Sequence, residues 1–116
     1  ALVTPYIEDV QRRIIANYEA DGIACVADRR LDISDNFAFG EVSAATIRQM
    51  CLDVSLHGPD AILIYCTNLA GAGIVRGIEA ETGVPVIDSA AAAVWMAMAA
   101  AGREAPGLAK WGCLLD

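Results

Sequence analysis

The stretch that decides the fold is DAILIYC, residues 60–66, a nearly continuous apolar run that leads into the polar segment TNLAGAG. Strands buried on both faces have this pattern, whereas half-exposed strands alternate apolar and polar residues. Three further short runs, at residues 1–3, 23–27 and 84–87, share the pattern of residues 61–66. The sequence therefore predicts four strands of a parallel sheet that is covered on both faces.

Helical patterns fill the intervals between these four runs. Pro5 after Thr4 favours a capped helix start, Ser43 is a cap for a second helix, and Gly83 ends a third. Asp88 and Ser89 open a fourth helix, which Gly102 closes. The apolar positions that recur at helical spacing are Ile7, Val10, Ile14 and Tyr18; Ile47, Met50, Cys51 and Val54; and Ile74, Val75 and Ile78.

The alternation of strand and helix predicts a doubly wound, four-stranded α/β sheet with the flavodoxin-like strand order 2-1-3-4. We expect one α/β domain over residues 1–102. The tail over residues 103–116 is interpreted as a loop with an apolar end that docks on another domain or subunit. Since residue 1 already reads as part of a strand, we expect the chain to belong to something longer.

Composition limits the classes of function. The chain has 116 residues, 56% of them hydrophobic, and a formal net charge of −7, which argues against disorder, nucleic-acid binding and anionic membrane surfaces. The longest apolar stretch, residues 90–102, is too short to span a bilayer. The four cysteines form no CxxC pair, so neither a zinc site nor a disulfide scaffold is expected. We predict a cytoplasmic protein with reduced thiols.

Ligands of such sheets bind beyond the carboxyl ends of the strands, at residues 4–6, 28–36, 66–68 and 88–89 here. Cys66 ends the third predicted strand and faces the start of a predicted helix, where the helix dipole and free amides favour a thiolate and bind carboxylates. The other interpretation is a buried cysteine that acts as a small hydrophobic residue.

Four polar residues share this edge with Cys66, and each has two interpretations. Thr67 and Asn68 either bind a ligand oxygen or cap the next helix. Asn36 either binds substrate or belongs to an ordinary turn. Tyr6 is either a hydrogen-bond donor in a cleft or an aromatic residue on a helix face.

Two further features of the sequence, a glycine-rich motif and the histidine, do not indicate a cofactor site. GAGIVRG, with Gly71, Gly73 and Gly77, matches the dinucleotide-binding fingerprint weakly and lacks the Gly-Lys-Ser/Thr of a Walker loop. His57, the only histidine, is expected at the opposite edge of the sheet from Cys66, so no Cys–His catalytic pair is predicted. We expect no metal and no nucleotide.

Four segments together resemble the C-terminal half of the maleate cis–trans isomerases. They are VTPYIEDV, the DIS-DN segment, DAILIYCTNL and GVPVIDS…AAVW, and the resemblance covers residues 2 to about 102. That family belongs with arylmalonate decarboxylase in the aspartate/glutamate racemase superfamily. The resemblance implies two similar α/β domains, related by a pseudo-twofold axis, with the active site between them.

The resemblance also implies roles for individual residues in a cofactor-independent isomerase of small dicarboxylates. Cys66 matches the second of two opposed catalytic cysteines and would handle a proton while the first adds to the double bond. Tyr6 and Asn36 match positions that hold the substrate carboxylates, and Thr67 and Asn68 match the backbone that cradles one of them. The Thr-Asn pair favours the isomerase branch, since the decarboxylases tend to carry glycines there.

The chain departs from the family pattern because the first half, with the other cysteine, is absent. Cys25 is expected inside a strand, Cys51 on a helix face and Cys113 in the tail, so none of them matches it. We therefore expect a preceding homologous domain, a homo-oligomer, or both. The alternatives are an arylmalonate decarboxylase-like activity, an amino-acid or hydantoin racemase-like activity, and an incomplete module that only binds carboxylates. Phe37 and Phe39 are candidates for substrate choice or for the core.

Overall fold

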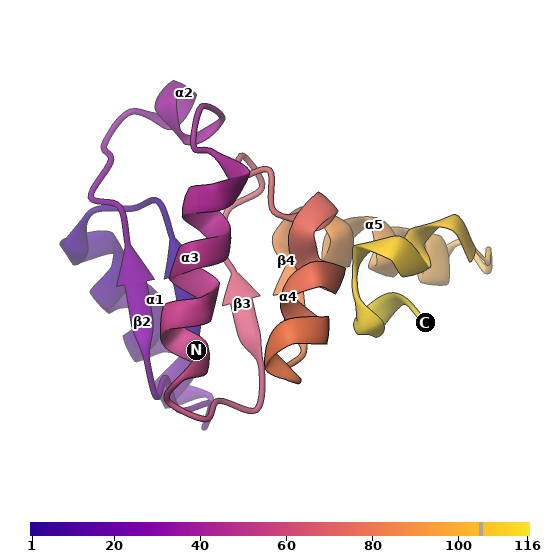
Figure 1. Cartoon of the computed structure of the whole chain (residues 1–116), viewed down its shortest axis with the longest axis horizontal. Helices are drawn as coiled ribbons and strands as arrows, with labels where there is room; N and C mark the ends of the chain where they lie inside the picture. The colour runs from indigo at the N-terminus through magenta and orange to yellow at the C-terminus, as the bar shows by residue number, and fades with distance from the viewer. Residues whose placement is uncertain (105) are drawn as a thin grey trace.

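The computed structural model of the chain describes residues 1–104 and 106–116. Its centre is one four-stranded, all-parallel sheet in the order β2-β1-β3-β4 (Figure 1). The strands are β1 (Leu2–Thr4), β2 (Asp28–Arg30), β3 (Ile62–Ile64) and β4 (Val86–Asp88). Leu2 of the inner strand β1 lies opposite Asp28 of β2 and, on its other side, Leu63 of β3. The predicted α/β class and strand order are confirmed.

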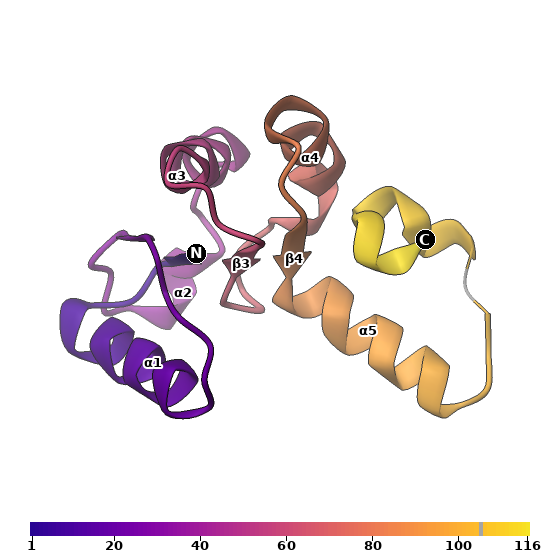
Figure 2. The same ribbon diagram turned by 90° about the horizontal axis from the view of Figure 1, so that it is seen from below.

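Five helices surround the sheet in unequal layers. They are α1 (Glu8–Ala20), α2 (Asn36–Phe39), α3 (Ala44–Ser55), α4 (Val75–Thr82) and α5 (Ser89–Ala100). α3 and α4 lie side by side on one face, α1 lies on the other, and α5 runs away from the sheet (Figure 2). Short 3-10 segments follow at Ala72–Ile74, Pro106–Trp111 and Cys113–Leu115.

The helices α3 and α4 form where the sequence predicts them. The Ser43 hydroxyl accepts the Thr46 N–H at 3.1 Å and caps α3, as expected. The predicted apolar face of α3 is buried; its members are Ile47, Met50, Cys51 and Val54. At the end of α4, Gly83 has φ +70°, which is the left-handed conformation that favours glycine.

The prediction for α1 is wrong at its start and on its buried face. The helix begins at Glu8 rather than at Pro5, because the Thr4 hydroxyl accepts the Tyr6 N–H at 3.2 Å and residues 4–6 form a turn. Ile7 and Val10 are exposed, although the spacing places them on the apolar stripe. Of the residues of α1, all of which the structure describes, Gln11 alone is buried.

The second strand also lies elsewhere than predicted. Residues 23–27 are not a strand, and Ile23 and Val26 are more than half exposed. β2 is instead the charged segment Asp28–Arg30, which edge strands tolerate because one side of their backbone faces solvent. Cys25 is therefore in a loop, where its thiol lies 3.4 Å from the Ala27 carbonyl oxygen.

The last part of the chain carries an apolar helix and a folded tail. Asp88 caps α5 by accepting the Ala91 N–H at 2.9 Å, as predicted, yet only Ala91 of this helix is buried. The tail forms 3-10 segments rather than a plain loop and lies beside α4, where the Glu79 carboxylate accepts the Cys113 N–H at 3.0 Å. Across the described part of the chain, no helix, α5 included, is both long and apolar enough to cross a membrane.

Candidate functional site at the carboxyl edge of the sheet

The ends of β1 and β3 bring Tyr6 and Cys66 together at the carboxyl edge of the sheet. Each of them is the second residue after its strand, and the strands are hydrogen-bonded neighbours. Burial is the main reason that the pKa of the Tyr6 phenol is raised from 10.0 to about 12, and the adjacent Cys66 thiol adds to the shift. The phenol is therefore a neutral hydrogen-bond donor at physiological pH.

Cys66 itself is only 6% exposed and belongs to the hydrophobic core. Between Cys66 and α4 the chain forms a turn at residues 67–69 and the 3-10 segment Ala72–Ile74, which runs directly into α4. The Leu69 N–H donates to the Cys66 carbonyl at 3.2 Å and closes that turn.

The structure brings Asn36 and Asn68 together as a second pair. The Asn68 side-chain amide donates to the Asn36 side-chain oxygen at 3.0 Å, which joins α2 to the turn after Cys66. Neither Thr67 nor Asn68 caps a helix, so the capping interpretation is wrong for both. Both residues, like Asn36, are exposed, which leaves their polar groups open to a ligand.

Phe39 connects the two pairs. Its ring meets the Tyr6 ring edge to face, with 5.4 Å between the ring centres and 79° between the planes. It is 5% exposed and belongs to the core, whereas Phe37 on the same short helix is 79% exposed. The short helix α2, which begins after the Asp35 cap, was not predicted, since four residues carry no helical periodicity.

The remaining residues of interest lie apart from this edge. His57 follows α3 and precedes β3, so it sits at the opposite end of the sheet from Cys66, as expected. Cys51 is fully buried in α3, and burial raises the pKa of its thiol to about 12. Gly71 serves packing, because a Cβ there would lie 2.7 Å from Asp88 Oδ2 and 2.9 Å from Ile64 Cδ1.

Two of the cavities outside the candidate site lie next to α5 and next to α1. One, of about 470 Å³, separates α5 from the tail and is lined by residues such as Trp95, Met98 and Leu115. The other, of about 370 Å³, is apolar and is lined by α1, the following loop and the sheet, with Tyr18, Ile23 and Leu63 among its residues. Within residues 1–104 and 106–116, no group of three or more His, Cys, Asp or Glu side chains is placed to hold a metal ion.

Sequence reasoning missed Gln11, whose buried amide joins the turn at Thr4 to β2. A signal for it exists in the spacing. Residues 7, 11, 14 and 18 form a helical stripe as regular as the predicted one, with Gln11 in place of Val10. An apolar stripe that contains one glutamine indicates a buried amide with a specific partner.

Comparison with known proteins identifies the family. The family described as arylmalonate decarboxylase matches residues 1–111. The chain belongs to the arylmalonate decarboxylase family. Arylmalonate decarboxylase of Bordetella bronchiseptica is 32% identical over the whole chain and 49% of its own length, and maleate isomerase of Nocardia farcinica is 29% identical over 82% of the chain and 38% of its own length.

The solved structures give the same family and fold. A mutant of arylmalonate decarboxylase in the liganded form matches the whole chain with a TM-score of 0.92 at 31% identity, over 50% of its own length. The chain thus spans about half the length of the curated relatives it matches, in keeping with the half-length resemblance found in the sequence. Isomerase- or decarboxylase-type enzymes are the relatives of this domain.

Proposed function

We propose that this domain supplies one half of the active site of a cofactor-independent isomerase that acts on small dicarboxylates, with Cys66 as one of two opposed catalytic thiols. The observation that carries the proposal is the Tyr6–Cys66 pair at the carboxyl edge of the sheet, in a chain of this family. A phenol donor beside a thiol suits a reaction that moves one proton next to a carboxylate.

In the proposed isomerisation the thiolate of the opposing cysteine adds to one alkene carbon of maleate. The alkene electron pair moves onto the other carbon and its carboxylate as an enediolate, and the Cys66 thiol protonates that carbon. The new single bond rotates. The Cys66 thiolate then removes the same proton, the double bond re-forms as the trans isomer, and the opposing thiolate leaves. Protons and electrons balance, and the chemistry needs neither metal nor nucleotide.

Neutral donors would stabilise the enediolate. Tyr6 offers a phenol whose raised pKa keeps its proton in place, and Asn36, Thr67 and Asn68 offer exposed amide and hydroxyl groups at the same edge. Such preorganised donors stabilise charge that develops on a carboxylate in the transition state. The Asn36–Asn68 hydrogen bond fixes two of these groups relative to each other.

Decarboxylation of an arylmalonate is the second candidate, and the family match and the 32% identity to the Bordetella enzyme favour it. Loss of carbon dioxide would leave the bond electrons on the remaining carboxylate as an enediolate. Cys66 would protonate the α-carbon and then recover a proton from solvent. Both reactions use the same thiol donor, so the choice between them falls to the groups that face Cys66 from the other half of the site. A racemase-like reaction, in which one proton is exchanged, is a further candidate because it would use the same thiol donor.

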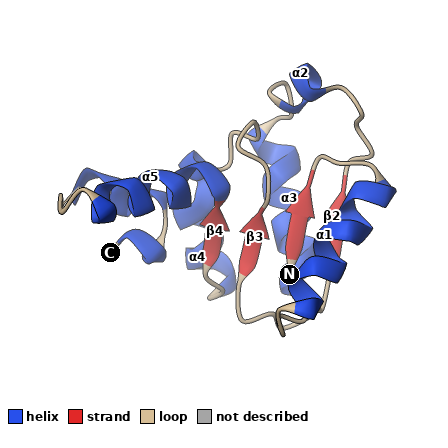
Figure 3. Ribbon diagram, turned by 180° about the vertical axis from the view of Figure 1, so that it is seen from behind, coloured by secondary structure: helices blue, strands red, loops and turns tan. Residues whose placement is uncertain are grey.

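We propose that this other half is a second α/β unit that covers α5 and the open face of the sheet. On the face that bears α1, β3 and β4 carry no helix (Figure 3). The apolar cavity lies on this side, and Val94, Trp95 and Met96 of α5 are exposed around the helix. Their exposure, with the half-length match to relatives, supports a preceding homologous domain or a second copy as the cover. The cytoplasmic location of the protein stays a prediction.

The proposed site is tested by protection of Cys66. Alkylation of each cysteine is followed by peptide mapping with and without maleate, and the exposed Cys113 provides a reference in the same sample. We expect maleate to slow Cys66 alone, acetate to have less effect, and Tyr6→Phe to weaken the protection. Equal labelling of Cys66 with and without maleate would count against the site.

A second measurement separates the reactions. The chain is combined with the amino-terminal half of the Bordetella decarboxylase, and proton NMR follows maleate and phenylmalonate. Fumarate formation that Cys66→Ala abolishes supports the isomerase, and phenylacetate formation that it abolishes supports the decarboxylase. Turnover that survives Cys66→Ala rejects the role of this thiol in both.

A further inference from the structure

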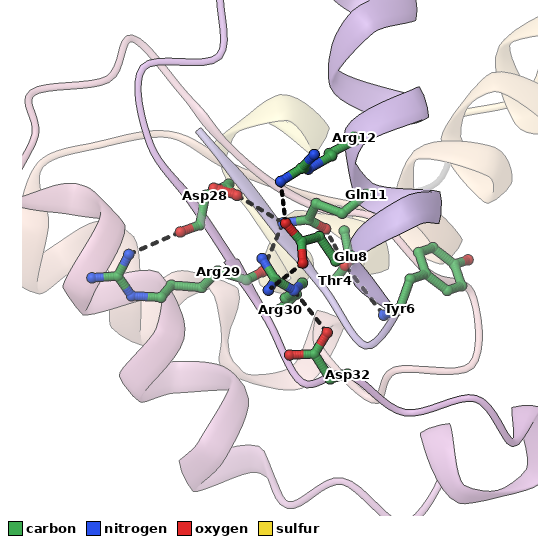
Figure 4. Close-up of polar contacts among 9 residues, drawn as sticks. All are labelled: Thr4, Tyr6, Glu8, Gln11, Arg12, Asp28, Arg29, Arg30 and Asp32. Atoms are coloured by element: carbon green, nitrogen blue, oxygen red, sulfur yellow. Dashed lines mark hydrogen bonds and ion pairs between the residues drawn. The ribbon is translucent and has the colours of Figure 1, made fainter.

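The buried amide of Gln11 lies at the centre of a polar network between α1, β1 and β2 (Figure 4). Gln11 is 1% exposed, and Thr4 beside it is fully buried. Around them lie ion pairs such as Arg12–Glu8 and Arg30–Asp32, whose side chains are partly or largely exposed. Exposed ion pairs of this kind contribute little to stability, so the buried amide and hydroxyl are the groups that hold the network together.

Each hydrogen bond of this buried pair has one possible direction. The Gln11 Nε2 donates to Asp28 Oδ2 at 3.2 Å and to the Arg29 carbonyl oxygen at 3.3 Å, both of which only accept. Its Oε1 therefore faces Thr4 and accepts the hydroxyl proton. Since the Thr4 hydroxyl has spent its only proton, it can only accept from the Tyr6 N–H, at 3.2 Å.

This chain of bonds ends at the backbone of Tyr6, where the candidate site begins. A second contact holds the same residue, because the Tyr6 carbonyl oxygen accepts the Asp32 N–H at 3.2 Å. With its backbone fixed on both sides, the Tyr6 ring packs edge to face on Phe39 and lies near enough to the Cys66 thiol for that thiol to help raise the pKa of the phenol. The turn at residues 4–6 thus transmits the position of Gln11 to the phenol.

We propose that Gln11 is a positioning residue, which acts through the Thr4 hydroxyl to hold Tyr6 over the Cys66 thiol. The inference rests on the proposed function for its biological meaning, but the contacts that carry it involve the backbone of Tyr6 and do not include Cys66. A purely structural glutamine would stabilise the whole domain and leave the Tyr6–Cys66 pair as it is. A positioning glutamine affects that pair while the rest of the fold stays intact.

The test compares alkylation of Cys66 with that of Cys51 in the intact chain without ligand. Cys51 is fully buried in α3, so its labelling reports opening of the whole domain. Thr4→Val removes the hydroxyl with little change in shape, Gln11→Met removes the amide, and Thr4→Ser keeps a hydroxyl as the rescue. Arg13→Gln on the same helix is the control, since Arg13 is exposed and pairs only with Asp9 among the ion pairs described.

We expect Thr4→Val and Gln11→Met to raise the Cys66 rate relative to the Cys51 rate by about threefold to tenfold, the range that one lost hydrogen bond gives. Thr4→Ser and Arg13→Gln should leave the ratio unchanged. A parallel rise of both cysteines, or no change in either, would overturn the proposal, because the network would then be structural or irrelevant.

The Tyr6 phenol gives a second readout. In ¹³C-tyrosine NMR, its pKa of about 12 should fall toward 10.0 in Thr4→Val, while Tyr18, whose pKa burial also raises, should not move. An unchanged Tyr6 titration contradicts the positioning role. Failure of the proposed function looks different: maleate would not protect Cys66 in the wild type, whereas the Cys66-to-Cys51 ratio would still respond to Thr4→Val.

Discussion

The helices on the two faces of the sheet bury their apolar side chains to different extents. On one face, α3 and α4 bury a full set of apolar side chains, among them Ile47, Val54, Val75 and Ile78. On the other face, α1 buries only Gln11 and α5 only Ala91, although α5 has no charged residue. The contrast teaches that helices of the chain itself bury the first face, whereas the helices on the second face leave most of their apolar side chains partly or fully exposed.

Truncation of one apolar side chain on each face should give the largest difference. Ile47→Ala on the closed face removes a fully buried side chain and should lower the free energy of unfolding by about 2–5 kcal/mol. Val10→Ala on the open face should change it by about 0.5 kcal/mol or less, since Val10 is exposed. Urea unfolding of both variants measures the difference, and similar losses would show that the open face is closed in solution.

The next largest effect is expected at Gly71, where the end of β4 meets the turn after Cys66. Gly71→Ala places a methyl group against Asp88 Oδ2 and Ile64 and should cost about 1–3 kcal/mol. Gly73→Ala is the matched control, because no atom lies within 4 Å of its added Cβ. Thermal unfolding of the two variants checks this. Equal melting temperatures would mean that the space beside Asp88 is larger than described.

A charge placed on the open face should weaken association. If the isolated chain uses a second copy as its cover, Met96→Lys on α5 should raise the dissociation constant about tenfold, as expected for loss of one apolar anchor. Leu56→Lys is the control, since Leu56 is also exposed but lies just beyond α3. Sedimentation equilibrium measures both. An equal response would show that association depends on overall charge rather than on α5.

The smallest effect concerns the pH dependence of stability at Asp88, the cap that leads from the sheet into α5. Burial, only partly offset by the amides of Ala91 and Ala90, raises the pKa of Asp88 above 3.8. A raised carboxyl pKa gives the folded state the tighter hold on the proton, so stability is highest at low pH and is lost as pH rises through the folded value.

Asp88→Asn should remove this part of the pH dependence while it keeps a capping oxygen for Ala91. The stability of the wild type relative to the variant should therefore fall as pH rises above 3.8 and through the raised pKa of Asp88, as urea midpoints would show. A difference that stays constant, or that grows in favour of the wild type, would mean that Asp88 is ionised without penalty.

The same contrast explains which parts of the structure the sequence could predict. On the closed face, spacing, the Ser43 cap and Gly83 gave α3 and α4 correctly, because the buried stripe and the apolar stripe coincide there. On the open face, Ile7 and Val10 are apolar yet exposed, and β2 is charged because it lies at an edge. Periodicity identifies the apolar face of a helix. It does not show whether another part of the same chain packs against that face.

The candidate site was predictable in its place but not in its contacts. Strand order put Tyr6, Asn36 and Cys66 at one edge, since the carboxyl ends of parallel strands meet there. The Asn36–Asn68 bond depends on the short helix α2, and the support of Tyr6 depends on Gln11, which no motif marks. Such contacts follow from tertiary packing, and only the three-dimensional structure provides them.

The close approach of Gly71 to Asp88 also restricts which substitutions these two positions can tolerate. A side chain at position 71 meets the buried carboxylate oxygen Oδ2 of position 88, so neither residue can be exchanged freely while the other stays. Serine at position 88 would keep an oxygen for the α5 cap and vacate the space of Oδ2, so that only the Ile64 side chain would have to shift to admit alanine at 71. Mutational libraries of this domain should therefore vary the two positions jointly, because their single substitutions will not add.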